Sequence, residues 1–275
     1  SDYISANKVK EEKVDFISKS NKEDYNALIR EANEKLFSNN NSTSVDLSAN
    51  EINELVSYGI MAPTAGNIQP WKWMYKGKKL ILIHDKKRAE SILNYRDTAS
   101  LMGLGAATEN VILKAHQMGF EVQMKMFPLG FPHDVYADFE FLKVKDNVNL
   151  ITEDHSFDKL VNVIPNRITN RTLDKRLPLK KDVEEYLQKI TKTISGANLK
   201  IFTSDEKINE LKEIITEIDW IIMTNKGCHQ QFMHEIRWNR KEVEDTKDGL
   251  DLDTFDITPT ERAGLMVAKN WNVTK

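Results

Sequence analysis

Several features that would point to particular classes of protein are scarce in this sequence or lacking. Only one cysteine, Cys228, occurs among 275 residues, which excludes an internal disulfide framework and any metal site built from several cysteines. No apolar run approaches the roughly 18–20 residues that a bilayer-spanning helix needs, and no charged-then-apolar leader opens the chain. We therefore expect a cytoplasmic protein without a membrane partner.

A surplus of positive charge is also lacking, since 39 Lys and Arg face 42 Asp and Glu and the formal net charge is −3. Proteins that bind nucleic acid mainly through its phosphates need such a surplus, so we do not expect a nucleic-acid partner. Three short basic runs, at 78–79, 86–88 and 180–181, are interpreted as solvated surface. The fractions of hydrophobic residues, 40%, and charged residues, 29%, are typical of a folded globular protein.

Local patterns predict both helices and strands in the first half of the chain. Ser48 and Glu51 have the spacing of a capping box, which opens a helix that Pro63 ends. Two apolar runs, 71–75 and 80–84, are separated by a Lys-Gly pair and predict a β-hairpin.

A long helix is predicted over 98–118, where apolar side chains recur every three or four residues, and Gly119 is the expected stop. Gly103 and Gly105 in its first turns lower helix propensity, so we expect another segment to approach the helix closely there. The alternating segments 122–127 and 136–144 then predict two strands.

Changes in composition divide the chain into three parts. Residues 1–45 are rich in Lys, Glu and Asn and are interpreted as a helical N-terminal extension or arm. The polar stretch 146–158 marks the boundary between a first half, 46–150, and a second half, 151–275.

The second half has weaker patterns. We expect a short helix over 157–164 and a strand over 199–202. Thr203 and Glu206 have capping-box spacing and open a long helix. The tail, 245–275, is interpreted as irregular.

The segment best suited to binding a small molecule is 62–71, with the sequence APTAGNIQPW. Two prolines and a glycine give this loop a defined backbone shape. Asn67 and Gln69 each offer a donor and an acceptor on a short side chain, which suits the edge of a planar heteroaromatic ring. The alternative is a helix-to-strand turn whose amides bond their own backbone.

A second candidate is the loop 166–171, with the sequence NRITNR. Arg167 and Arg171 flank Thr169, and arginine presents a planar fork that suits bidentate binding of phosphate. The alternatives are a solvated basic turn, or arginines paired with acidic neighbours.

No metal site is expected. The pairs Cys228-His229 and His234-Glu235 match no usual spacing of metal ligands. Cys228 is interpreted as a small apolar residue rather than a nucleophile.

In order and spacing, these segments resemble the nitroreductase family of FMN proteins over about residues 47–250. Residues 62–71 match the family's A-P-S-x-x-N-x-Q-P-W loop, with Thr64 in place of the usual serine. Residues 105–115 are similar to its long central helix, and 167–171 to its R-x-S-x-R phosphate loop. The most similar branch is the Acg-like one, in which two nitroreductase-like halves lie in one chain.

The resemblance implies an α+β fold in which helices pack on an antiparallel sheet, built as two related halves that form a pseudo-dimer. The phosphate loop follows the ring-binding loop instead of preceding it, so each half would supply one of the two loops. One flavin site per chain is implied, with the second half incomplete. The protein would be a monomeric pseudo-dimer or a homodimer.

The resemblance also implies roles for individual residues. Three would hold the FMN phosphate: Arg167, Thr169 and Arg171. Four would contact the isoalloxazine ring or the ribityl chain: Pro63, Thr64, Asn67 and Gln69. No side chain is expected to be catalytic, because the flavin carries the chemistry.

The implied function is that of an FMN-dependent NAD(P)H oxidoreductase that reduces an electron-poor small molecule, such as a nitroaromatic compound or a quinone. The alternative is a flavin-binding or flavin-sequestering protein with little turnover, because the sequence has no evident match for the basic pair that family members place near the C-terminus. A degenerate domain that binds no flavin is a third hypothesis.

Overall fold

The computed structural model describes residues 36–37, 43–143, 157–172 and 177–274. Most of the expected N-terminal extension, and the expected boundary near residue 150, lie outside the described residues. The chain divides into two compact units. Unit 1 comprises 1–169 and 240–250, and unit 2 comprises 170–239 and 251–275.

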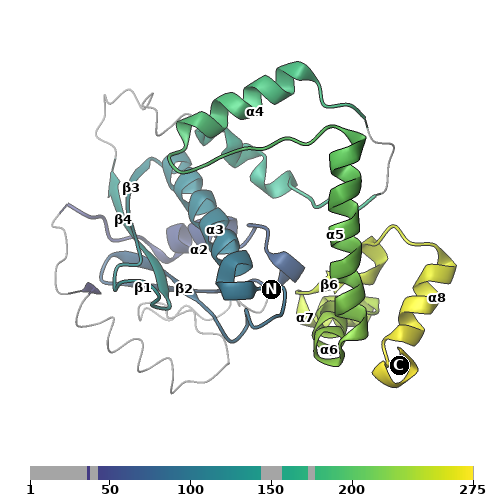
Figure 1. The fold of residues 1–275 in the computed structure, drawn as a ribbon. Coiled ribbons are helices and arrows are strands. Elements are labelled where there is room, and N and C mark those ends of the chain that lie inside the picture. The colour runs from purple at the N-terminus through teal and green to yellow at the C-terminus, as the bar shows by residue number, and fades with distance from the viewer. Residues whose placement is uncertain (1–35, 38–42, 144–156, 173–176, 275) are drawn as a thin grey trace. The chain divides into compact units, whose positions relative to one another are not determined.

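Unit 1 is built on a four-stranded antiparallel sheet with the order β1-β2-β4-β3 (Figure 1). The strands are β1 Trp71–Lys76, β2 Lys79–His84, β3 Phe120–Met126 and β4 Val135–Lys143. The predicted hairpin is confirmed, with β1 and β2 paired from Trp71↔His84 to Lys76↔Lys79. The two later strands are also confirmed, within a few residues of their predicted ends.

Two helices, α2 Ala49–Gly59 and α3 Thr98–Gln117, pack together on one face of this sheet (Figure 1). Alternate strand residues supply the core beneath them: Trp71, Trp73, Tyr75, Leu80, Leu82, Ala137, Phe139 and Phe141. The intervening residues Met74, Ile81 and Ile83 form a smaller cluster on the other face together with Leu36 and Val135, and Val135 joins them because the register of β2 and β4 shifts between Leu82 and Ile83. This alternation follows from the two-residue repeat of a strand.

Local signals fix the start of α2 and the end of α3. The capping box of α2 is confirmed, because Ser48 Oγ accepts from the Glu51 amide while the Glu51 carboxylate accepts from the Ser48 amide. Gly119, just beyond α3, has φ +82°, a conformation that glycine adopts without steric cost. The predicted long helix and its stop are therefore confirmed.

The basic run at 78–79 is not solvated surface throughout. The Lys79 ammonium lies 3.1 Å from a carboxylate oxygen of Asp138 and 2.8 Å from one of Glu140, and all three side chains are largely buried. The expectation of a solvated residue is wrong for Lys79, because β4 brings two carboxylates beside it across the sheet.

The remainder of unit 1 consists of short elements. Residues 157–164, expected as a short helix, form 3₁₀ turns over Asp158–Asn162 and Ile164–Asn166. Helix α7, Arg240–Thr246, belongs to unit 1 although the residues on either side of 240–250 belong to unit 2.

Unit 2 is mainly helical, with α4 Lys181–Thr193, α5 Asp205–Thr224, α6 Lys226–Glu235, α8 Pro259–Ala268 and α9 Trp271–Thr274. A two-residue strand, β5 Ile236–Arg237, pairs with β6 Leu250–Asp251, which begins at the last residue of unit 1. The buried centre of unit 2 is formed by four side chains: Met233, Ile236, Trp238 and Leu252.

Three predictions for the second half are wrong. Residues 199–202 form no strand, because no described segment pairs with them and an apolar run alone does not make a sheet. The cap of α5 is Ser204 rather than Thr203, and its hydroxyl accepts from the Lys207 amide. The tail is largely helical, because Thr258 and Glu261 form a capping box that opens α8.

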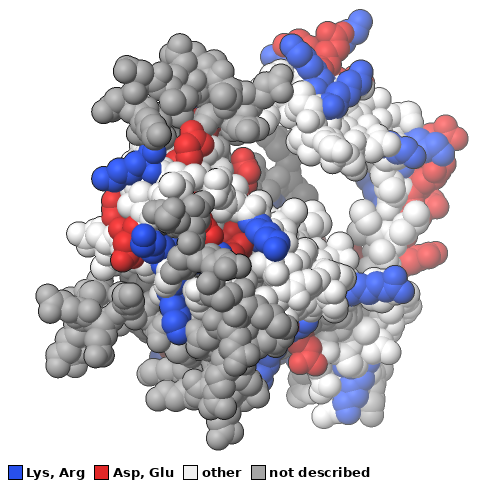
Figure 2. Space-filling model, turned by 90° about the vertical axis from the view of Figure 1, so that its left-hand side faces the viewer, with Lys and Arg blue, Asp and Glu red and all other residues white. Residues whose placement is uncertain are grey.

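The predicted α+β class, with an antiparallel sheet and packed helices, is confirmed. The organisation as two related halves stays a prediction. Basic and acidic side chains are intermixed on the face that Figure 2 shows. Within the described ranges, no helix combines the length and the apolar character needed to cross a membrane.

Candidate functional site

The loop between α2 and β1 has an unusual backbone. Gly66, Asn67 and Gln69 have φ values of +58°, +51° and +51°, and a left-handed conformation is uncommon for residues other than glycine. The Thr64 hydroxyl stabilises the bend by accepting from the Gln69 amide over 3.1 Å. The expectation of a defined backbone shape is confirmed, and we call residues 64–69 the amide loop.

Helix α3 packs against the amide loop. The close approach predicted at its glycines is found at Gly103, which faces the side chain of Thr64 and the carbonyl of Pro63. Gly105 instead faces the hydroxyl of Tyr136. The helix N-terminal half is therefore shaped to accommodate the loop.

The side-chain amides of Asn67 and Gln69 already take part in hydrogen bonds within unit 1. Gln69 Nε2 donates to the carbonyl oxygen of Lys247 over 2.8 Å and to Asn67 Oδ1 over 3.4 Å. The Asn67 side chain is exposed and that of Gln69 is half-buried. The alternative, a turn whose amides bond only their own backbone, does not account for Gln69, because its side chain donates to a carbonyl 178 residues away.

That segment, residues 247–249, is here called the clasp. The Gly249 amide donates to the carbonyl of Asn67 over 3.3 Å, and Asp248 Oδ2 accepts from Arg88 Nη2 over 2.7 Å. Arg88 also donates through Nε to the carbonyl of Ile68. One guanidinium therefore joins the amide loop to the clasp.

Neither the clasp nor the role of Arg88 was predicted from the sequence. The expectation that residues 86–88 are solvated surface is wrong for Arg88, whose side chain is 22% exposed and paired with Asp248. The pair is 160 residues apart, so no local pattern could reveal it. The one available signal was the Asp-Gly dipeptide at 248–249, which is typical of a turn.

Arg167, in the predicted phosphate loop, contacts the segment that leads into the amide loop. Its Nη2 donates to the carbonyl oxygen of Met61 over 3.3 Å, although the two residues are 106 positions apart. Arg167 and Thr169 both belong to unit 1 and are exposed. The structure thus brings the first residue of the predicted phosphate motif together with the segment that leads into Pro63.

Arg171 belongs to unit 2 and donates through Nη1 to the Thr254 hydroxyl over 3.4 Å. Neither Arg167 nor Arg171 forms an ion pair with a carboxylate in the part of the chain that the structure describes. The alternative in which these arginines neutralise acidic neighbours therefore has no support among the described residues.

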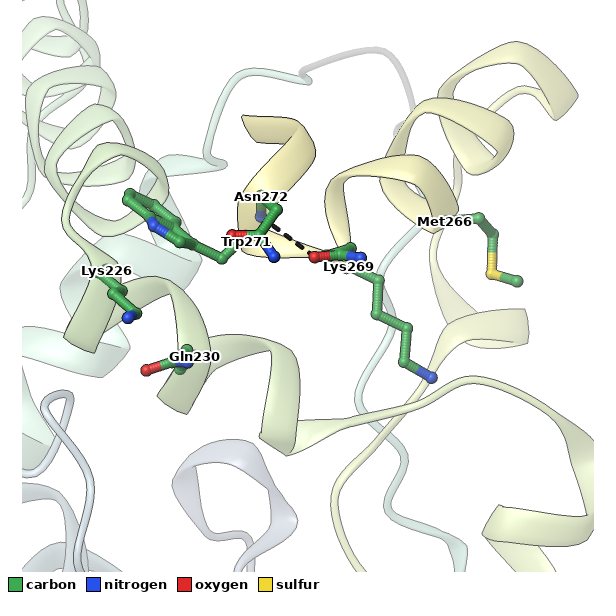
Figure 3. A pocket seen from close by; sticks show the side chains of 7 residues that line it. Lys226, Gln230, Met266, Lys269, Trp271 and Asn272 are labelled. Atoms are coloured by element: carbon green, nitrogen blue, oxygen red, sulfur yellow. Dashed lines mark hydrogen bonds between the residues drawn. The ribbon is translucent and has the colours of Figure 1, made fainter. Parts of the chain in front are cut away.

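Each of the two units has a surface cavity. The larger, of about 540 Å³, is in unit 2 and is lined by side chains of α6 and of the segment from α8 to α9 (Figure 3). Its lining includes Lys226, Gln230, Lys269 and Trp271. The other, of about 420 Å³, is in unit 1 along residues 86–97. No predicted site residue lines either cavity.

Across the described ranges, no group of three or more His, Cys, Asp or Glu side chains is placed to hold a metal ion. Cys228 is a free, half-buried thiol near the start of α6. His229, next to it, is 1% exposed, and its Nε2 lies 2.7 Å from the Ala268 carbonyl.

No known protein family matches the sequence, and no curated protein matches it. Two solved structures show a partial similarity. One is a nitroreductase family protein from Streptococcus pneumoniae TIGR4, at 13% identity and a TM-score of 0.30, covering 54% of this chain and 100% of that chain. The other is the NfrA1 nitroreductase from B. subtilis, at 15% identity and a TM-score of 0.30, covering 64% of this chain and 90% of that one. A likeness this weak assigns neither function nor cofactor.

Proposed function

We propose that the protein is an FMN-dependent NAD(P)H oxidoreductase that reduces an electron-poor small molecule. The observation that supports this most directly is the hydrogen bond from Arg167 to the Met61 carbonyl. It joins the predicted phosphate motif to the segment that leads into the amide loop. Both are needed for a ligand that carries a planar ring at one end and a phosphate at the other.

The residues present fit such a ligand. The exposed amide loop keeps hydrogen-bonding groups of Asn67 and Gln69 available for a ring edge. Arg167 and Arg171 have no carboxylate partner among the described residues, so their guanidinium groups are available to a phosphate. Pro63, Thr64 and Thr169 are the remaining proposed contacts.

Bound FMN would supply the hydride chemistry, accepting from NAD(P)H and reducing the acceptor. The protein's own contribution would be binding and orientation. Thr64 fixes the bend of the loop through the Gln69 amide, and the clasp fixes the loop from outside. Arg167 and Arg171 would neutralise the phosphate, and the Thr169 hydroxyl would donate a hydrogen bond to it. A small acceptor such as a nitroaromatic compound or a quinone is proposed as the second substrate.

The first test is the visible absorption spectrum of the purified full-length chain, before and after addition of FMN and desalting. A retained flavin band that NADH or NADPH bleaches anaerobically supports the proposal. A retained band that neither donor bleaches would overturn the oxidoreductase proposal and favour the alternative, a flavin-binding protein with little turnover. A colourless protein that does not take up FMN would overturn the proposal.

The phosphate assignment has its own test in Arg171→Ala. We expect FMN affinity to fall by about tenfold or more, because a bidentate charged contact is lost. The melting temperature should be almost unchanged, since the Arg171 side chain is exposed. Arg262→Ala is the matched control, because Arg262 is also in unit 2 and pairs with Asp253 instead. Equal FMN affinity in the two variants would reject the assignment.

A further inference from the structure

The larger of the two cavities has a wall built from two separate parts of unit 2. Lys226 and Gln230, one turn apart on α6, form one part, and side chains from 266–272, between α8 and α9, form the other (Figure 3). The cavity volume of about 540 Å³ is within the range of sites that bind small molecules.

The buried His229 joins the two parts of this wall. It lies between Lys226 and Gln230 on α6 and is 1% exposed. Its Nε2 is 2.7 Å from the carbonyl oxygen of Ala268, which can only accept, so this nitrogen carries the proton. The imidazole also packs edge-on against the Trp271 ring, with the ring centroids 5.2 Å apart. The wall is therefore held in place by a buried side chain.

The described lining carries positive charge only. Its ionisable side chains are Lys226 and Lys269, and neither forms an ion pair with a carboxylate among the described residues. The Lys269 ammonium instead lies 4.7 Å from the centroid of the Trp238 ring. An indole face attracts this cation but leaves its N–H donors able to bind an anion. The cavity therefore favours a ligand with a negative charge.

The same lining offers a surface for a flat ring. The Trp271 side chain is half-buried, so part of its indole ring is accessible, and the Met266 side chain is 48% exposed. Aromatic rings pack favourably against indole and against thioether sulfur. Gln230 and Asn272 add carboxamides that can donate to oxygen atoms. Cations and apolar groups in one cavity suit a ring that carries a carboxylate.

We propose that this cavity binds a small aromatic carboxylate. Lys226 and Lys269 neutralise the carboxylate, and Trp271 and Met266 pack against the ring. None of the residues proposed to contact FMN lines this cavity. It is thus a second ligand site, and it goes beyond the proposed function.

The test measures the binding of three probes to the full-length chain by fluorine NMR. 4-Fluorobenzoate should bind about tenfold more tightly than the neutral 4-fluorobenzamide, because the amide cannot form charge-assisted hydrogen bonds with the lysines. It should bind about threefold more tightly than 4,4-difluorocyclohexanecarboxylate, which keeps the charge but lacks the aromatic ring. Saturating FMN should leave the affinity for 4-fluorobenzoate unchanged.

A lysine variant locates the site. Lys226→Gln should weaken 4-fluorobenzoate binding about threefold or more, because one of two cations is removed, and the preference over the amide should disappear in the Lys226→Gln/Lys269→Gln double variant. Lys189→Gln is the matched control, since Lys189 is an exposed lysine of unit 2 that does not line the cavity. The thermal melt of Lys226→Gln should match that of the wild type because Lys226 is exposed.

Each outcome bears on one claim. Failure of 4-fluorobenzoate to bind, equal affinity for either comparison probe, displacement by FMN, or equal losses in Lys226→Gln and Lys189→Gln would overturn the inference. FMN uptake by a chain that binds no probe would leave the proposed function standing. Lysine-dependent probe binding by a chain that takes up no FMN would support the inference while the proposed function fails.

Discussion

A Cβ atom added to Gly103 would lie 2.9 Å from Cγ2 of Thr64 and 3.4 Å from the Pro63 carbonyl oxygen. The first distance is shorter than two carbon atoms tolerate. The backbone of α3 and the amide loop therefore pack too closely at this point to accommodate even one added methyl group.

Gly103→Ala should destabilise the protein by about 1–3 kcal/mol, because an overpacked contact forces the loop or its side chain to move. FMN affinity should fall as well if the loop binds the ring. Gly105→Ala is the matched control, since its Cβ would meet only the Tyr136 hydroxyl at 3.5 Å. That variant should be neutral or more stable, because alanine favours the helix. Urea unfolding measures both, and equal losses would contradict the assignment.

Lys79→Met should cost about 3–5 kcal/mol of folding free energy. Removal of one member of a buried ionic group leaves the carboxylates of Asp138 and Glu140 buried without their cation. Lys181→Met is the comparison, because Lys181 is 90% exposed in its pair with Glu185. A small loss in Lys79→Met, similar to that of the control, would mean that water solvates this group.

The stability of the fold should depend on Glu140 in acid. Burial raises the pKa of Glu140, but hydrogen bonds from Lys79 and Ser44 outweigh burial and hold it below its usual value. A depressed carboxyl pKa adds stability above the unfolded value of about 4.3, and this share is lost as the pH falls through the folded value. Glu140→Gln should therefore flatten the decline in unfolding free energy between about pH 5 and pH 3. An unchanged acid slope would contradict this.

His84 should add a second loss of stability on acidification, one that begins nearer to neutral pH than the loss due to Glu140. Its side chain is 4% exposed, its Nε2 has no hydrogen-bond partner among the described residues, and burial lowers its pKa. Below about pH 6.5 the imidazole is protonated in the unfolded chain but stays neutral in the folded chain. The free energy of unfolding therefore falls as the pH decreases.

His84→Leu should remove this component and reduce the difference in unfolding free energy between pH 7 and pH 5. The backbone bond from the His84 amide to the Asp134 carbonyl is retained in the variant. The exposed His234 provides the control, as His234→Gln should leave the slope as it is in the wild type. Identical slopes in His84→Leu and the wild type would show that His84 protonates freely in the folded state.

Elements with a strong local signal were predicted from sequence. The capping residues Ser48 and Glu51, the hairpin of β1 and β2, and the stop at Gly119 each depend on neighbours a few positions away. The defined shape of the amide loop belongs to the same class, because proline and glycine determine it locally.

Features that depend on distant partners were not predicted. Lys79 and Arg88 look like surface cations in sequence, and only the fold shows the carboxylates 59 and 160 positions away that pair with them. The helix α8 is a different case, since the signal at Thr258 and Glu261 was present but the charged, irregular composition around it outweighed it. The roles of the seven candidate binding residues stay predictions.

The clasp also has a consequence for the order in which the protein can mature on a ribosome. The amide loop is synthesised long before residues 247–249, and Gln69 reaches its partner only after 178 further positions have been added. The sheet and its two helices can assemble earlier, from contacts made within unit 1. The nascent chain should therefore pass through a stage in which the sheet and its two helices are folded while the amide loop still lacks its hydrogen bond from Gln69 to Lys247.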